Sequence, residues 1–283
     1  MTGPTLDLDH LRSWIGRTET TEDVIAPRAA RLMQATLDRT PTLSDGDPLP
    51  PFWHHLYFNE AVRASDLGVD GHEKLGRFLP PVPLPRRMWA GGAVDFRRGL
   101  FLGDRVEKCS TIQDVALKTG RSGPLCFVTV GHDYRVDGAL CLSERQDIVY
   151  RAMPQPGAPG PAPRPAPGGA IRGRMIVPDP VLLFRYSALI FYGHRIHYDP
   201  DFTRGEEGYP GLIVHGPLIA TLLADIGAEN RRETLHRFDF RAVSPLFAPT
   251  PFRIAAAPAG ASVSAWAETP EGNLAMVATL DFV

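Results

Sequence analysis

The sequence is poor in three features that would point to particular classes of protein. It has only 3 cysteines, and their spacing resembles no metal site. No apolar run approaches the ~20 residues that span a bilayer. Residues 1–10 lack the basic and apolar regions of a secretory signal. We therefore expect a cytoplasmic protein with no membrane partner and no metal.

The chain also lacks a strong excess of positive or negative charge. The chain has 30 Lys and Arg against 32 Asp and Glu, which gives a formal net charge of −2. A near-neutral balance argues against nucleic acid as a partner. The 283 residues, 43% of them hydrophobic, are enough for one large or two ordinary domains with a sizeable core.

Residues 1–152 predict an N-terminal unit rich in strands. Helical spacing of apolar residues between positions 9 and 40 is interrupted by Thr-rich turns near Thr18 and Thr40. A polar loop with many prolines follows, between positions 66 and 85, and prolines exclude helix and inner strand there. Alternating patterns and Gly-containing turns then predict an antiparallel meander, with strands at residues 94–96, 105–117, 125–134 and 139–150.

A Pro- and Gly-rich linker, residues 153–170, separates this unit from a C-terminal one, residues 171–283. In the second unit Asp179 and Pro180 predict a helix start. Four strands are expected near the end of the chain, at residues 236–247, 252–257, 263–268 and 274–283. Asp95-Phe96-Arg97 recurs as Asp239-Phe240-Arg241 ahead of the later strands of each unit, as duplication of one unit would leave it, although so short a match also arises by chance.

The most informative stretch is residues 186–225. It contains His194, His197 and His215, and its first part is polar, aromatic and aperiodic, which predicts a loop. Gly216 and Pro217 then predict the start of an apolar helix. The free N–H groups at such a helix start can approach an acceptor oxygen.

This stretch resembles the signature of the MaoC-like (R)-specific enoyl-thioester hydratases. The run Phe191-Tyr192-Gly193-His194-Arg195-Ile196-His197-Tyr198-Asp199 is most similar to the type-2 hydroxyacyl-thioester dehydratases, among them the mesaconyl-C4-CoA and itaconyl-CoA hydratases. Tyr192 departs from the family pattern, which has Asn or Asp there. The resemblance implies an α+β double hot-dog fold, two curved antiparallel sheets each wrapped on a helix. Because the first unit lacks a His-Gly helix opening, the single active site is expected in the second.

The resemblance also assigns roles. His197 is the expected catalytic base, and Tyr192 takes the place of the family's water-orienting residue. The helix opening at Gly216, with Val214 and His215, is expected to contact the thioester oxygen, although His215 is as compatible with packing. Further contacts with substrate or with the CoA phosphates are expected from His194, Arg195, Arg86, Arg87 and Trp89. An ion pair of Arg195 with Asp199 or Glu206, and an exposed basic turn at residues 86–87, are the structural alternatives.

The expected function is therefore that of a lyase, an acyl-CoA hydratase/dehydratase without metal or redox cofactor. Its first expected substrate is a branched C5 dicarboxylyl-CoA of the itaconyl or mesaconyl type. The alternatives are a 3-hydroxyacyl-thioester dehydratase for plain acyl chains and an acyl-CoA-binding protein whose site Tyr192 has disabled. A homodimer is possible, because the edge strands of such sheets favour pairing.

Overall fold

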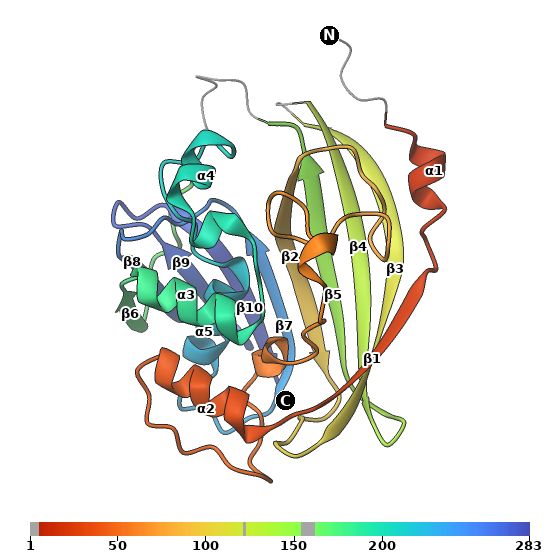
Figure 1. The fold of residues 1–283 in the computed structure, drawn as a ribbon. Helices are drawn as coiled ribbons and strands as arrows, with labels where there is room; N and C mark the ends of the chain where they lie inside the picture. Colours follow the sequence, from red (N-terminus) through yellow and green to blue (C-terminus); the bar gives the residue numbers. More distant parts are fainter. Residues whose placement is uncertain (1–5, 121–122, 154–161) are drawn as a thin grey trace.

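The computed structural model describes residues 6–120, 123–153 and 162–283, whose strands form one ten-stranded antiparallel sheet (Figure 1). The strand order is β1-β3-β4-β5-β2-β7-β10-β9-β8-β6, so each half of the chain contributes one contiguous half of the sheet. The N-terminal half consists of β1 (Thr18–Val24), β2 (Arg86–Phe96), β3 (Arg105–Gly120), β4 (Gly123–Val136) and β5 (Ala139–Arg151). The C-terminal half consists of β6 (Arg172–Ile176), β7 (Leu235–Ala242), β8 (Phe252–Ala259), β9 (Ser262–Glu268) and β10 (Leu274–Phe282).

The helices are few, and most of them are short. They are α1 (Leu8–Arg12), α2 (Pro27–Thr36), α3 (Pro180–Leu189), α4 (Pro200–Gly205) and α5 (Gly216–Ala228). Three 3₁₀ helices complete the structure: η1 (Trp53–Leu56), η2 (Ala64–Asp66) and η3 (Arg195–His197). No helix among the described residues is long and apolar enough to cross a membrane.

The two halves meet where β2 pairs with β7, from Gly91 opposite Arg241 to Asp95 opposite Arg237. Arg237 reinforces this junction, because its guanidinium lies 2.7 Å from the Asp95 carboxylate and 2.6 Å from that of Asp239. The two copies of the Asp-Phe-Arg repeat therefore lie on adjacent, paired strands. This position is what duplication of a strand-rich unit predicts.

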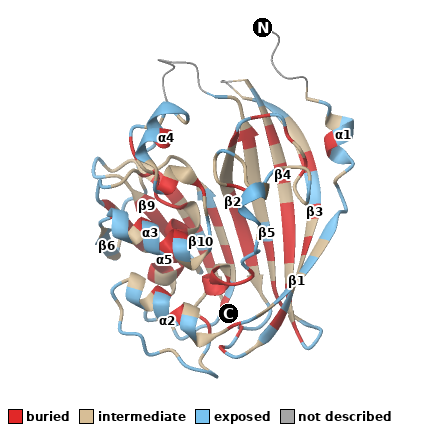
Figure 2. Cartoon of the chain, viewed as in Figure 1, coloured by how far each residue is buried: buried red, intermediate tan, exposed pale blue. Residues whose placement is uncertain are grey.

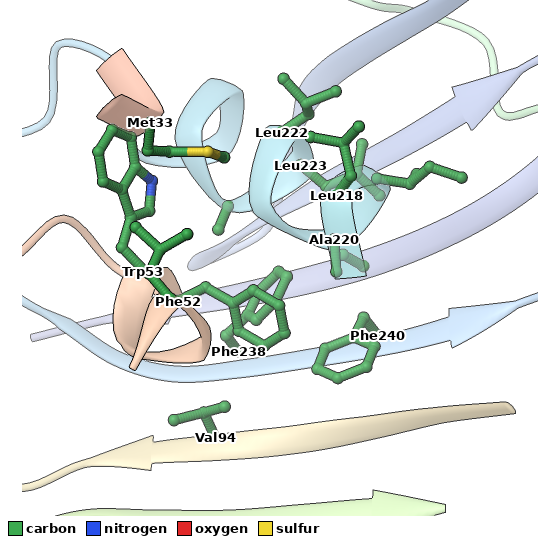
Figure 3. Close-up of a cluster of buried hydrophobic side chains, with 14 of the residues drawn as sticks. Met33, Phe52, Trp53, Val94, Leu218, Ala220, Leu222, Leu223, Phe238 and Phe240 are labelled. Atoms are coloured by element: carbon green, nitrogen blue, oxygen red, sulfur yellow. The ribbon is translucent and has the colours of Figure 1, made fainter. Parts of the chain in front are cut away.

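The C-terminal half wraps its strands around α5, which begins at Gly216 as the sequence predicts. Nine of its 13 residues are buried, because the helix is apolar on nearly every side. Figure 3 shows Leu218, Leu222 and Leu223 of this helix above Phe238 and Phe240 of β7. Phe52 closes the same core, with its ring 5.3 Å from that of Phe238 and 5.2 Å from that of Phe240.

The N-terminal half has no equivalent of α5 among its described residues. The helix that packs on its strands is α1, 5 residues long, against β3, while α2 packs on α3 of the other half. The long segment between η1 and β2 lies in front of β2, β5 and β4 in Figure 1. A second, smaller core lies here, and Leu11, Val82 and Leu84 pack in it against apolar residues of β3, β4 and β5. The expectation of a central helix in each unit therefore fits the C-terminal half alone.

Most predicted elements are present, with one strand missed. Asp179 caps α3 by accepting a hydrogen bond from the Leu182 N–H, as predicted. The turn expected near Thr18 is instead the start of β1, an edge strand paired with β3 from Thr18 opposite Thr111 to Val24 opposite Arg105. Residues 154–161 of the predicted linker lie outside the described residues, so the domain boundary stays a prediction.

Candidate active site

The loop between α3 and α5 is held in shape by its own charged residues. The Arg195 guanidinium lies 2.7 Å from the Asp199 carboxylate and stacks over the Phe202 ring at 4.2 Å. Asp199 in turn caps α4 by accepting from the Phe202 N–H. Of the two roles considered for Arg195, the structure shows the ion pair with Asp199. The consequence is a rigid turn, η3, that ends at His197.

His197 is buried at the centre of this site, with 5% of its surface exposed. The helix α5 that follows the loop is largely buried as well, as its red segments in Figure 2 show. Its Nδ1–H donates to the carbonyl oxygen of Ile213 at 2.7 Å. The other nitrogen, Nε2, has no hydrogen-bond partner among the described residues, so it is free to accept a proton. Burial lowers the pKa of His197 to about 4, although the bond to Ile213 opposes this shift. The imidazole is therefore neutral at pH 7, as a base must be.

His215 lies against His197 with stacked rings, 3.6 Å between centroids. Its Nε2 is hydrogen-bonded to the Ser187 hydroxyl at 2.8 Å, and its Nδ1 is buried without a partner among the residues that the structure describes. Burial, together with the nearby histidines, holds its pKa well below the usual value. The contacts thus place His215 as packing behind His197, joined to the cavity described below through Ser187.

The start of α5 lies beside this pair of rings. Among the described residues, no backbone carbonyl accepts from the Gly216 N–H, which points out of the helix start. A Cβ at position 216 would lie 3.0 Å from Trp89, so the absence of a side chain here leaves room between the helix and that ring. Val214 behaves differently from the expectation: its N–H pairs with the Leu246 carbonyl, and its side chain lies in the core.

Tyr192 is joined to two residues that the sequence did not single out. Its hydroxyl lies 2.5 Å from Nε2 of His72, and Nδ1 of His72 lies 2.7 Å from the Asp70 carboxylate. His194 completes the group, with its ring 3.9 Å from that of His72 and 5.5 Å from that of His197. The N-terminal half therefore adds an imidazole and a carboxylate to the Tyr192 hydroxyl, and the three groups form a chain at a site built on the C-terminal half.

A cavity of about 890 Å³ opens between the two halves next to this chain. The loop between α3 and α5, the candidate catalytic loop, contributes Tyr192, Gly193 and Tyr198 to its wall, and α3 contributes Ser187. The segment from Phe58 to Leu79 forms the opposite wall, including His72. The remaining polar wall comes from β2 to β5, as Arg87, Lys108, Ser110, His132 and Gln146. Its size suits an acyl or pantetheine chain.

The adjacent arginines of β2 have opposite environments, because successive side chains of a strand face opposite sides. Arg86 is buried with 3% exposure, hydrogen-bonded to Glu207 at 3.0 Å and stacked over Tyr209 at 4.1 Å. Arg87 lines the cavity and forms no ion pair with any described residue. The expected contact with a CoA phosphate or another anion is therefore open to Arg87 and not to Arg86, whose charge Glu207 already neutralises. Trp89 packs on the main core beside Phe240.

The sequence and the fold both match known proteins. Residues 52–248 match the family model of hydroxyacyl-thioester dehydratase type 2. The chain is 45% identical, over 95% of its length and 96% of the relative's, to a mesaconyl-C(4)-CoA hydratase of Chloroflexus aurantiacus. It is also 28% identical, over 73% of its length and 77% of the relative's, to the mitochondrial hydroxyacyl-thioester dehydratase type 2 of Schizosaccharomyces pombe. The chain belongs to the type 2 hydroxyacyl-thioester dehydratases, a family of hydro-lyases.

Solved structures confirm the fold of this type 2 dehydratase family member. HtdX of Mycobacterium tuberculosis matches with a TM-score of 0.68 at 20% identity, covering 94% of this chain and 100% of HtdX. A MaoC-like dehydratase of Phytophthora capsici matches with a TM-score of 0.68 at 14% identity, covering 98% of both chains. A further M. tuberculosis protein described as a double hot-dog matches with a TM-score of 0.59 at 13% identity, covering 95% of this chain and 96% of that protein. The predicted double hot-dog is confirmed.

Proposed function

We propose that the chain catalyses the reversible addition of water to an enoyl-CoA thioester, with a mesaconyl-type C5 dicarboxylyl-CoA as its substrate class. The observation that carries this proposal is His197: a buried, neutral imidazole whose Nδ1–H is fixed by Ile213 and whose Nε2 is free, beside the open N–H of Gly216. Family membership and the similarity to a mesaconyl-C(4)-CoA hydratase support the reaction type.

The chemistry requires a base, an oriented water and donors for the thioester oxygen as it gains enolate charge. Nε2 of His197 takes a proton from water as the water oxygen bonds to the β carbon. The N–H of Gly216, favoured by the N-terminal dipole of α5, donates to the thioester oxygen. The same proton then passes from His197 to the α carbon, so that water is added without net change in the enzyme.

Arg87 supports a substrate with a second carboxylate. In a mesaconyl-C4 thioester the β carbon carries the free carboxylate, so this group lies next to the carbon that water attacks. Arg87 lies close enough to Tyr192 and His72 for its charge to act on the pKa of both residues. A guanidinium on a cavity wall without an ion-pair partner in the described chain is suited to bind a carboxylate.

A plain enoyl chain is the second candidate, and the apolar part of the cavity favours it. Leu79, Val130, Ile148 and Phe184 line the same space as the polar residues, and about 890 Å³ exceeds the need of a C5 acyl group. The acyl-CoA-binding alternative remains open because Tyr192 replaces the family's Asn or Asp. A cytoplasmic location and a homodimer stay predictions.

A panel of thioesters tests the proposal. Mesaconyl-C4-CoA, crotonyl-CoA and a longer enoyl-CoA are followed by loss of enoyl absorbance, and itaconyl-CoA by chromatography of the product. We expect the highest kcat/KM for mesaconyl-C4-CoA. Arg87→Gln should lower that value about 10–100-fold, as loss of a charged hydrogen bond does, and leave crotonyl-CoA nearly unchanged. Arg97→Gln, at an exposed site, is the matched control. Binding without turnover of any thioester would instead establish an acyl-CoA-binding protein.

A further inference from the structure

We propose that His72 and Asp70 are positioning residues that orient the Tyr192 hydroxyl as an acceptor for the attacking water. Through them a segment of the N-terminal half replaces the water-orienting amide or acid that the family carries at position 192. This inference rests on the proposed hydratase function, and it assigns part of that site to a region outside the loop and helix that carry the family signature.

The direction of each hydrogen bond follows from the donors available. A carboxylate accepts only, so Nδ1 of His72 carries the proton that it shares with Asp70. In a neutral imidazole Nε2 is then an acceptor, and the Tyr192 O–H must donate to it. Once the hydroxyl proton is committed to His72, the lone pairs of the Tyr192 oxygen are left to accept from water.

The protonation states agree with this pattern. Burial and the charge of Arg87 lower the pKa of His72 to about 4, against the opposing bond to Asp70. Burial alone would raise the pKa of Asp70, but its carboxylate accepts hydrogen bonds from the side chain and the backbone N–H of His72, and these hold the pKa well below its usual range. Burial raises the pKa of Tyr192. At neutral pH the chain therefore consists of a carboxylate, a neutral imidazole and a phenol.

The segment that carries Asp70 and His72 is fixed against the catalytic loop. We call residues 67–73 the docking loop, closed by a bridge between Leu67 and Glu73. Its carbonyls at Val69 and Asp70 accept from the side chain and the N–H of Arg195, at 3.1 and 2.9 Å. Gly71 has a φ of +85°, and a Cβ there would overlap the Gly193 carbonyl oxygen. This close backbone contact holds the docking loop in the position that brings His72 next to Tyr192.

Two acceptors then flank the site of water. One hydrogen of the water is accepted by Tyr192 and the other by Nε2 of His197, whose ring centroid lies 5.8 Å from that of Tyr192. The second hydrogen is the one that His197 takes as the C–O bond forms and returns to the α carbon. No proton has to leave Tyr192, which matches its raised pKa.

Kinetics of four single variants and one double variant test the assignment in the 283-residue enzyme. Tyr192→Phe and His72→Phe should each lower kcat by roughly 10–100-fold, as misplaced reactants do, with KM changed less than about 3-fold. The double variant should lose no more than either single one, because both remove the same acceptor. His72→Gln should recover part of the activity, because its amide oxygen can accept from Tyr192. Asp70→Asn should lose activity with the fold intact, because its amide can reverse the His72 tautomer.

Several outcomes would overturn the proposal: His72→Phe with unchanged kcat, losses that multiply in the double variant, or no difference between the Gln and Phe variants at position 72. Each variant is checked for an unchanged unfolding transition. His236→Phe, at an exposed histidine of β7, controls for replacement of a ring.

A second readout does not depend on turnover. Proton NMR should show downfield resonances from the Tyr192 hydroxyl and from Nδ1–H of His72, because short hydrogen bonds deshield their protons. Tyr192→Phe should remove the first, and Asp70→Asn should shift or remove the second. If these resonances are absent from the wild type, the proposed hydrogen-bond chain from Asp70 through His72 to Tyr192 is overturned, even if hydration is observed. Their presence in an enzyme that hydrates no thioester overturns the proposed function instead.

Discussion

Two buried polar clusters, one in each half of the sheet, differ in how fully their hydrogen bonds are made. In the N-terminal half, both oxygens of the buried Glu144 carboxylate are occupied, by His54, His55, Tyr134 and Gln146 at 2.9 to 3.1 Å. Burial would raise the pKa of Glu144, yet the charge of His55 and the hydrogen bonds from both histidines hold it well below its usual value. In the C-terminal half, Nε2 of His197 has no hydrogen-bond partner within residues 6–120, 123–153 and 162–283. A saturated cluster stabilises, whereas an incomplete one is available to react.

The halves also differ in their helices, because the described part of the N-terminal half contains no counterpart of α5. Where the C-terminal half fills its sheet with α5, the N-terminal half has a long segment over a cavity of about 890 Å³. That segment includes the docking loop, which brings His72 to Tyr192. In the proposed mechanism, the N-terminal half therefore supplies space for substrate and orients Tyr192 through His72.

The prediction with the largest expected effect tests whether the general base comes from the C-terminal half alone. His197→Ala should lower kcat by roughly 10²–10⁴-fold, the usual contribution of a general base. His132→Ala removes a buried histidine that lines the cavity from the N-terminal half, and should lower kcat less than about 10-fold. Initial rates of enoyl-CoA hydration measure both. Equal losses would mean that the two halves share the chemistry and that the base does not come from the C-terminal half alone.

The sequence predicts the part of this site whose residues lie close together in the chain. His197, Gly216 and the start of α5 lie within one short stretch with a family signature and a Gly-Pro helix opening. His72 is 120 residues away from Tyr192, in a segment whose prolines and glycines predict only a loop. Its contact with Tyr192 depends on how the halves pack, which no local pattern encodes.

Two other features that the sequence did not predict also depend on how distant segments pack. The strand β1 has the sequence TETTEDV, with no apolar residue before Val24, so it shows no alternation of apolar and polar residues. It exists because β3 offers an edge for pairing. Arg86 and Arg87 are equivalent in sequence, and only the register of β2 determines which of them faces the cavity.

The next effect tests the contribution of the docking loop. Gly71→Ala places a methyl group against the Gly193 carbonyl at a backbone angle that disfavours any side chain. We expect the loop to move away from Tyr192 and kcat to fall about 10–100-fold, since a displacement of ~1 Å can cost that much. Gly46→Ala is the matched control, because it has the same φ of +85° but open space around it. If both variants lose activity equally, the loss reflects backbone strain and not the contact with the catalytic loop.

The smallest expected effect per residue is a loss of stability at acidic pH, and it applies to histidines of both halves. Burial is the main cause that lowers the pKa of His72, His132 and His197 from 6.5 to about 4. Below pH 6.5 the unfolded chain binds these protons and the folded chain does not, so the free energy of unfolding falls as pH falls toward 4. Each such histidine contributes roughly 1 kcal/mol of destabilisation at about pH 5.5.

Urea unfolding at about pH 7.5 and about pH 5.5 measures this acid effect. His132→Gln from the N-terminal half and His197→Gln from the C-terminal half should each reduce the difference in unfolding free energy by roughly 1 kcal/mol, while exposed His236→Gln should leave it unchanged. The carboxylates of Asp70 and Glu144, whose pKa values are lowered, lose their stabilisation only at more acidic pH, outside this window. A reduction confined to one of the two buried variants would show that the other histidine gains protons in the folded state, and that its half of the molecule is open to water.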